Sequence, residues 1–244
     1  MREVAVVTGA GQGIGLAICE RILRDGQYAV ALLESSPEGR NAAERLRTKG
    51  GDVLHVQCDV SSESDVVSAM EAVTEFGSVR CVINNAGIFP RMSALQMDFE
   101  DWMKVVRVNL GGTFLVSRTF APEMLRSGGG AIVNITSGRA VGGAINGSHY
   151  SASKGGLISL TRSLALEWAP AIRVNAVMPG VTDTAQPRAE GITDEELYAR
   201  GSTIPLGRIG QPDDIAEAVM FLLGAGARYI TGQTIAVNGG AVMR

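Results

Sequence analysis

Two spacings of apolar residues alternate along most of the chain. Short apolar runs rich in β-branched residues are typical of strands buried on both faces, and the longer stretches between them have the spacing of amphipathic helices. Strands are predicted at residues 4–8, 28–33, 53–58, 79–83, 131–136, 173–177 and 234–237. Helices are predicted at about 14–24, 37–49, 62–76, 98–126 (broken near Gly111-Gly112), 150–168 and 212–223. This strand–helix alternation predicts an α/β protein with one doubly wound parallel sheet and helices on both faces.

The pattern weakens over residues 181–210. Thr193-Asp-Glu-Glu196 is a capping-box sequence, which predicts a short helix running to Arg200. A long, loosely patterned segment in a compact domain is often a lid. The chain has no tandem repeat or linker, so we expect residues 1–244 to form a single domain with a substrate lid at about 181–210.

Composition narrows the classes of partner. Of the 244 residues, 45% are hydrophobic and 19% charged, which suits a globular protein with a sizeable core. The net charge is −3 and no block of like charge stands out, so neither nucleic acid nor a membrane is an expected partner. The chain enters a strand pattern at its start and has no run long enough to span a bilayer, so we expect a cytoplasmic protein.

The cysteines do not indicate a metal site. Cys19, Cys58 and Cys81 are odd in number and widely spaced. A metal site would need closer clustering, and buried free thiols are typical of a reducing compartment. We therefore expect three buried thiols and no metal.

A phenol and an ammonium lie one helical turn apart near the middle of the chain. Tyr150 and Lys154 are separated by four residues and so share one face of the predicted helix. A nearby cation stabilises phenolate and lowers a pKa that is otherwise about 10, so Tyr150 could exchange protons near neutral pH. The hydroxyl of Ser137, at the end of a predicted strand, could hold a carbonyl oxygen beside that phenol.

The first strand leads into a nucleotide-binding pattern. A glycine-rich turn, Gly9-Ala-Gly-Gln-Gly-Ile-Gly15, separates it from the first helix. Such a turn permits close approach of a pyrophosphate to the helix N-terminus. Glu34 ends the second strand about twenty residues later, where a carboxylate would bind ribose hydroxyls and repel a 2′-phosphate. This favours NAD over NADP.

Small and polar residues end the other strands too. They include Asp59, Asn84, Ser137 and Pro179. Since parallel strands place their carboxyl ends at one edge of a sheet, where ligands bind, these residues together predict a cofactor cleft.

These motifs, in this order, resemble the short-chain dehydrogenase/reductase family over essentially the whole chain. The matching features are Thr8-Gly9-x-x-x-Gly13-x-Gly15, Asn84-Asn85-Ala86-Gly87, Asn109, Ser137, Tyr150-x-x-x-Lys154, Pro179-Gly180, Gly232-Gln233 and Gly239-Gly240. The resemblance implies a Rossmann-like fold and hydride transfer between a nicotinamide and an alcohol or carbonyl substrate.

The resemblance also implies residue roles. Tyr150 would be the acid/base, Lys154 would lower its pKa and bind the nicotinamide ribose, Ser137 would orient the carbonyl, and Asn109 would hold a relay water. The cofactor would be held by Gly9, Gln12, Gly13, Ile14, Gly15, Glu34, Asp59, Val60, Asn85, Ala86, Gly87, Tyr150, Lys154, Pro179, Gly180, Thr182 and Thr184. The chain departs from the family pattern at Thr182, at Asn238, and at Gln27, which lengthens the turn before the second strand.

The leading hypothesis is an oxidoreductase that uses NAD(H) and a secondary alcohol or ketone. One alternative is an NADPH-dependent 3-oxoacyl-carrier-protein reductase, against which Glu34 argues. The other is a non-catalytic dinucleotide sensor, which would not need Tyr150, Lys154 and Ser137 together. The sequence indicates neither the substrate nor the physiological direction.

For four further side chains, a structural or surface role is a simpler interpretation than a role in catalysis or substrate binding. His149 points away from Tyr150 on a helix, which favours a packing or helix-start role. His55 lies in a strand pattern and is expected to be structural. Arg91 and Arg139 could meet an anionic substrate, but we expect both to be solvated surface residues.

Assembly is inferred from the resemblance, which implies pairing through helices at about 102–126 and 150–168. The small residues Ser151, Ala152, Gly155 and Gly156 would permit close helix approach. We expect a homotetramer.

Overall fold

Seven parallel strands form one sheet in the computed structural model, which describes residues 2–189 and 191–243. The strand order is β3-β2-β1-β4-β5-β6-β7. The strands are β1 (Glu3–Thr8), β2 (Ala29–Glu34), β3 (Val53–Gln57), β4 (Ser78–Asn84), β5 (Gly130–Ile135), β6 (Ile172–Pro179) and β7 (Thr234–Val237). The order reverses between β1 and β4, and a reversal of this kind opens a crevice at the carboxyl edge of a doubly wound sheet.

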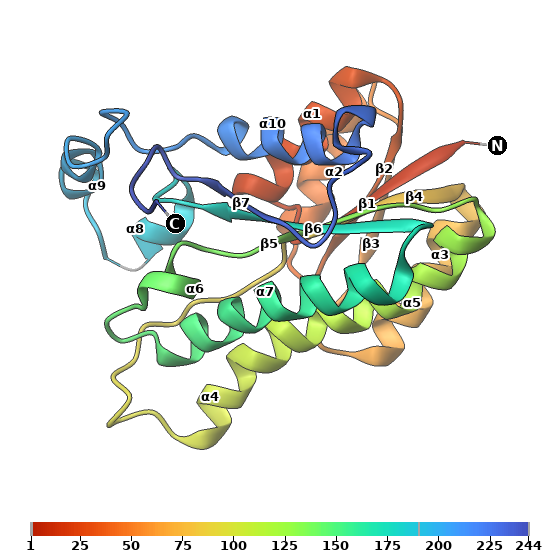
Figure 1. Cartoon of the computed structure of the whole chain (residues 1–244). Helices are drawn as coiled ribbons and strands as arrows, with labels where there is room; N and C mark the ends of the chain where they lie inside the picture. The colour runs from red at the N-terminus through yellow and green to blue at the C-terminus, as the bar shows by residue number, and fades with distance from the viewer. Residues whose placement is uncertain (1, 190, 244) are drawn as a thin grey trace.

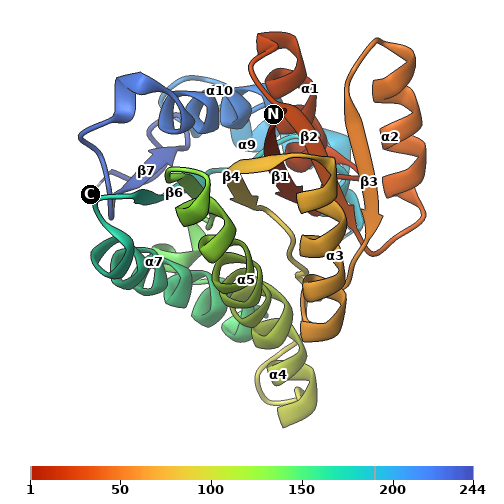
Figure 2. The ribbon, with the colours of Figure 1, turned by 90° about the vertical axis from the view of Figure 1, so that its right-hand side faces the viewer.

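Helices cover both faces of the sheet (Figures 1 and 2). The helices α1 (Gly13–Asp25), α2 (Glu38–Thr48) and α10 (Pro212–Leu223) pack on one face, and α3 (Glu63–Phe76), α5 (Gly112–Arg126) and α7 (Ser148–Trp168) pack on the other. The remaining helical segments are α4 (Phe99–Val106), the π-helical η1 (Arg107–Gly111), α6 (Arg139–Gly142), α8 (Ala185–Ala189), α9 (Asp194–Gly201) and the 3₁₀ turn η2 (Ala225–Ala227).

The continuous apolar runs of the strands explain why the sheet has a hydrophobic core on each of its two faces. Ala5 and Val7 of β1 belong to the core on one face, whereas Val4 and Val6 belong to the core on the other. Because side chains alternate along a strand, a continuous apolar run buries both of its faces. The predicted α/β fold is therefore confirmed.

The long helical stretch around Asn109 differs from its prediction. We expected a break near Gly111-Gly112, yet both residues keep right-handed helical backbone angles. A π turn connects α4 to α5 instead, with the Gly112 N–H donating to the Arg107 carbonyl five residues back. The extra residue in this turn is absorbed without breaking the helix, as in other π bulges.

Short helices gather at the carboxyl edge of the sheet. Figure 1 shows α6, α8 and α9 at the left of the molecule, at the end of the sheet where β6 and β7 terminate. The sequence predicted α9 from its capping box, which the structure contains, but it did not predict α6 or α8, which are only four and five residues long. None of the helices in residues 2–189 and 191–243 has the length and apolar character needed to cross a membrane.

Candidate functional site

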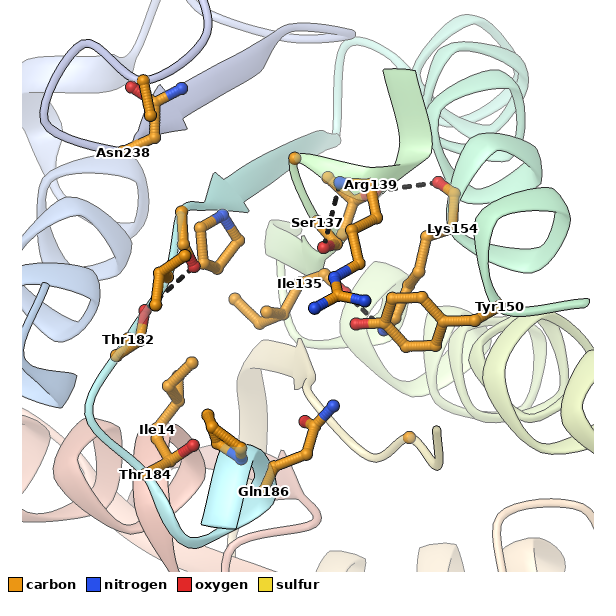
Figure 3. Close-up of a pocket in the computed structure, with 18 of the residues that line it drawn as sticks. Ile14, Ile135, Ser137, Arg139, Tyr150, Lys154, Thr182, Thr184, Gln186 and Asn238 are labelled. Atoms are coloured by element: carbon orange, nitrogen blue, oxygen red, sulfur yellow. Dashed lines mark hydrogen bonds between the residues drawn. The ribbon is translucent and has the colours of Figure 1, made fainter. Parts of the chain in front are cut away.

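A cavity of about 290 Å³ lies at the carboxyl edge of the sheet. Its walls come from the ends of β4, β5 and β6, from α1, α6 and α7, from the C-terminal segment, and from residues 181–210, the segment predicted to be a lid and called the lid below. Figure 3 shows that Ser137, Tyr150 and Lys154 face this cavity from one side, with Thr182, Thr184 and Ile14 on the other. The sequence-predicted catalytic triplet is thus brought together with part of the predicted cofactor set.

Tyr150 and Lys154 occupy consecutive turns near the start of α7. The Lys154 Nζ lies 5.9 Å from the centre of the Tyr150 ring and donates a 2.8 Å hydrogen bond to the Ile135 carbonyl at the end of β5. Its side chain is buried, and burial lowers the pKa of Lys154 to about 8 because desolvation disfavours the charged form. The lysine is therefore held rigidly, at the position from which its charge can act on the phenol.

Ser137 is fixed by the same strand end. It is half-buried, lines the cavity, and its Oγ accepts a hydrogen bond from the Arg139 backbone N–H at 3.2 Å. One residue earlier, the Thr136 Oγ1 donates to the Lys154 carbonyl at 2.8 Å. This bond fastens the end of β5 to α7, so the serine and the tyrosine keep their relative placement.

Asn109 lies behind the cavity rather than in its wall. Its Oδ1 accepts from the Ile88 N–H at 2.8 Å, and its Nδ2 donates to the Ile88 carbonyl and to the Ser153 Oγ. Ser153 in turn donates to the Tyr150 carbonyl. The π turn therefore links the segment after β4 to the helix that carries Tyr150, while the relay-water role of Asn109 stays a prediction.

The glycine turn fits a dinucleotide in its local geometry. A Cβ on Gly15 would lie 2.3 Å from the Gly9 carbonyl oxygen, and one on Gly9 would lie 2.6 Å from the Ala86 Cα. The Asn85 side-chain amide donates to the Thr8 and Gly9 carbonyls, which braces the turn from β4. A close-packed turn at the N-terminus of α1 is the arrangement that accepts a pyrophosphate.

Glu34 reaches this turn from the end of β2. Its Oε2 accepts a 3.1 Å hydrogen bond from the Gly11 N–H, and its Oε1 accepts from the Ser35 and Ser36 N–H groups. The carboxylate thus lies beside the phosphate-binding turn, where an adenosine ribose would sit. This position fits the ribose role assigned to Glu34 from the sequence.

The other predicted cofactor residues fall into two groups. Those lining the cavity are Ile14, Asn85, Gly87, Tyr150, Lys154, Pro179, Gly180, Thr182 and Thr184. Those outside its lining are Gly9, Gln12, Gly13, Gly15, Glu34, Asp59, Val60 and Ala86. Asp59 is exposed at the end of β3, next to β2, and Val60 is buried against Gly112. The cavity therefore coincides with the part of the predicted cleft where Tyr150 and Lys154 lie.

Several cavity residues were given no site role in the sequence analysis. They come from α6, the lid and the C-terminal segment, and include Arg139, Gln186, Ile192, Arg200, Asn238, Ala241 and Val242. The expectation that Arg139 is a solvated surface residue is wrong, because the short helix α6 turns it back over the cavity. Arg91 is exposed, as expected.

Other predictions from single side chains are confirmed. The His149 Nδ1 accepts the Tyr150 backbone N–H at 2.7 Å at the start of α7, which is the helix-start role. Desolvation lowers the pKa of His149 and so favours the neutral imidazole. Cys19, Cys58 and Cys81 are buried free thiols.

Comparison with known proteins agrees with this geometry. The family described as Enoyl-(Acyl carrier protein) reductase matches residues 9–242. A cis-4-hydroxycyclohexanecarboxylate dehydrogenase of Sinomonas cyclohexanicum is 38% identical, over 98% of this chain and 96% of the relative. A 3-oxoacyl-[acyl-carrier-protein] reductase of Staphylococcus aureus is 39% identical, over 100% of this chain and 99% of the relative.

A solved structure gives the same result for the fold. The crystal structure of a proposed NAD(P)-dependent gluconate 5-dehydrogenase from Beutenbergia cavernae, with bound NADP, superposes with a TM-score of 0.91 at 35% identity. The match covers 98% of this chain and 96% of that one. With the family match over nearly the full length, it shows that the chain is an NAD(P)-dependent oxidoreductase of the short-chain dehydrogenase/reductase family.

Proposed function

We propose that the protein interconverts a secondary alcohol and a ketone, with NAD(H) as cofactor and Tyr150 as the acid/base. The observation that carries the proposal is the convergence of Tyr150, Lys154 and Ser137 on one cavity beside the glycine turn. A non-catalytic sensor would not need Tyr150, Lys154 and Ser137 together, because a phenol beside a serine hydroxyl serves proton transfer and substrate orientation, which binding alone does not require.

Each residue has a separate task in this reaction. Tyr150 gives a proton to the carbonyl oxygen in reduction and takes one from the alcohol in oxidation. Lys154 stabilises the phenolate and holds the nicotinamide ribose, while Ser137 orients the substrate oxygen by hydrogen bonding. When bound, the nicotinamide supplies or accepts the hydride, and the protein contributes position and charge.

The experiment for this function is an absorbance screen at 340 nm. The protein is incubated with NADH or NAD and a panel of ketones and secondary alcohols, and the Tyr150→Phe protein serves as the blank. We expect at least one pair that turns over only in the protein with Tyr150. Turnover of equal rate in both proteins would remove Tyr150 from the mechanism.

The proposed preference for NAD rests on Glu34. Its carboxylate already lies against the turn and would repel a 2′-phosphate. For Glu34→Gln we expect the NADH:NADPH ratio of kcat/KM to fall about tenfold, since the neutral amide removes that repulsion. Glu44→Gln, an exposed change on α2, is the matched control. A wild-type protein that favours NADPH would contradict the Glu34 argument.

A second candidate is an NADPH-dependent 3-oxoacyl-carrier-protein reductase. It is supported by the name of the Staphylococcus aureus relative and by the NADP bound in the Beutenbergia cavernae structure. Turnover of an acetoacetyl thioester with NADPH, at a higher kcat/KM than any small ketone with NADH, would favour it over the leading proposal.

We also propose a homotetramer that pairs through α5 and α7. Phe114 and Leu125 on α5 and Leu166 on α7 are exposed apolar side chains that a partner could cover. The small residues named for this contact are partly used within the chain, because Gly156 packs against Leu110 and Gly155 lies over the Ala140 carbonyl. Light scattering during size-exclusion chromatography would measure the mass.

A further inference from the structure

The cavity collects positive charge in a protein that is negative overall. The chain has a formal net charge of −3, yet Arg139, Lys154 and Arg200 all line the cavity. Among the described residues that line it there is no aspartate or glutamate. The mechanism uses Lys154 and leaves the two arginines without a task.

Arg139 lies next to the reacting groups. Its backbone N–H donates to the Ser137 Oγ, and its guanidinium carbon lies 4.7 Å from the centre of the Phe89 ring. That ring packs against Tyr150, with centres 4.2 Å apart. Figure 3 shows the Arg139 side chain crossing the cavity toward the tip of Tyr150. Stacking engages the face of a guanidinium and orients its N–H edge, the part that binds an oxyanion.

Arg200 approaches the cavity from the lid. It is half-buried on α9, and its side chain makes no hydrogen bond or ion pair with any residue of 2–189 and 191–243. Two other arginines of the same region are paired, Arg188 with Asp183 and Asp194, and Arg208 with Asp214. Arg200 is therefore the cation that the lid presents to the cavity.

The phosphates of a dinucleotide do not account for these two residues. The pyrophosphate site is the glycine turn at the start of α1, whereas Arg139 follows β5 and packs on Phe89. One guanidinium near the acid/base and a second in the lining of the same cavity instead match an anionic group on the molecule that is oxidised or reduced. The planar fork of a guanidinium binds a carboxylate through two parallel hydrogen bonds.

We propose that the substrate carries an anionic group, best a carboxylate, which Arg139 and Arg200 bind while the reacting carbon lies at Tyr150. This inference rests on the alcohol–ketone function proposed above and names its substrate class. Arg139 sets the distance between the carboxylate and the carbonyl. Arg200 adds its charge when the lid lies over the cavity.

The test compares keto acids with their primary amides, which have nearly the same size but no charge. We expect wild-type kcat/KM to favour the acid by about 30-fold or more, the range of a charged hydrogen bond. In Arg139→Gln the acid:amide ratio should fall to about 3 or less. Arg200→Gln should lower it less, and Arg139→Lys should leave it intermediate, because the charge remains but the fork is lost. Arg126→Gln, at an exposed site on α5, is the matched control.

The results of this test distinguish a failure of the carboxylate inference from a failure of the proposed alcohol–ketone function. If neutral ketones turn over through Tyr150 but acids show no advantage, the inference fails and the function stands. If a phosphate-bearing ketone has a higher kcat/KM than the keto acid, the anionic group that the two arginines bind is a phosphate and not a carboxylate.

A binding measurement decides the matter even without turnover. Calorimetry on the NADH-bound Tyr150→Phe protein would compare a saturated carboxylate with its carboxamide. Tighter binding of the carboxylate, lost in the Arg139→Gln background, supports the inference. Equal binding of both, or a change in NADH affinity alone, overturns it.

Discussion

The two sides of the cavity are held in different ways. The side that carries Ser137, Tyr150 and Lys154 is fixed to the sheet: Lys154 is 4% exposed and bonded to the Ile135 carbonyl, and Thr136 bonds back to Lys154. Among the described residues of 181–210, a small apolar cluster is formed by Ile192, Leu197, Ile204 and Ile209 with Val181. A bridge between Thr182 and Gly210 and the ion pairs of Arg188 join residues within the segment. Its contacts with the rest of the described chain include the Leu206 N–H bond to the Gly239 carbonyl and the Arg208–Asp214 ion pair.

This contrast suggests a division of labour. Proton transfer needs fixed distances, and the side that carries Tyr150 is built into the core. Substrate choice needs variable contacts, and the lid is attached by interactions that each contribute little to stability. Changes at Tyr150 and Lys154 should therefore alter kcat, whereas changes in the lid, which together with Arg139 would contact the proposed carboxylate, should alter KM and local opening.

Lys154→Met is the most severe test of the fixed side. We expect kcat to fall about 100-fold or more, because the phenolate loses its cation. The free energy of unfolding should rise in this variant. Burial lowers the pKa of Lys154 from 10.5 to about 8, so the charged lysine destabilises the wild-type fold by up to ~3 kcal/mol at pH 7. Steady-state kinetics and urea unfolding measure the two effects.

The pH dependence of this change has a definite sign. The unfolded chain binds more protons at residue 154 than the native chain between pH 8 and 10.5. The stability advantage of Lys154→Met should thus be full below pH 8 and disappear as the pH rises through 10.5. An advantage that grew over that interval would contradict the buried, charged lysine.

Asn109→Ala tests how the π turn supports the site. It removes three side-chain hydrogen bonds, to the Ile88 N–H, the Ile88 carbonyl and the Ser153 Oγ. We expect a loss of about 2–3 kcal/mol in unfolding free energy and of about tenfold in kcat. Thr113→Val is the matched control, since it removes one bond to the Asn109 carbonyl and none to Ile88. Equal kcat losses in the two variants would assign Asn109 to folding alone.

Arg188→Ala tests the lid, with the smallest expected effect. Arg188 bonds Asp183, Asp194 and the Thr184 carbonyl, all at or near the surface. We expect less than 1 kcal/mol of global destabilisation, a KM raised a few-fold, and faster hydrogen exchange confined to the lid. Exchange that also quickens in α7 would show that the two sides are not independent. The mobility predicted for residues 181–210 is tested by the same exchange data on the wild-type protein.

The sequence predicted the sheet because its strands are continuous apolar runs and its turns are rich in glycine. It also placed Tyr150, Lys154, Ser137 and the glycine turn, since each follows a strand end or shares a helix face. These features depend on local spacing and on the rule that parallel strands end at one edge.

The sequence was less informative where tertiary contacts determine the local conformation or the direction of a side chain. The π turn at Arg107–Gly111 looks like a helix break, because a glycine pair is the only local signal. The sequence predicted Arg139 to be a surface residue, because it gave no sign of α6, the short helix that places its guanidinium over the Phe89 ring. Arg200 lies on a helix that was predicted, but nothing in its spacing indicated that this helix faces the cavity.

The most direct test of the central claim is the single substitution Tyr150→Phe. It keeps the ring that packs against Phe89 and removes the hydroxyl. With the best ketone from the screen, we predict that kcat falls about 1000-fold while the NADH dissociation constant, from fluorescence titration, stays within about threefold. Activity within tenfold of the wild-type value, with NADH still bound, would contradict the assignment of Tyr150 as the proton donor.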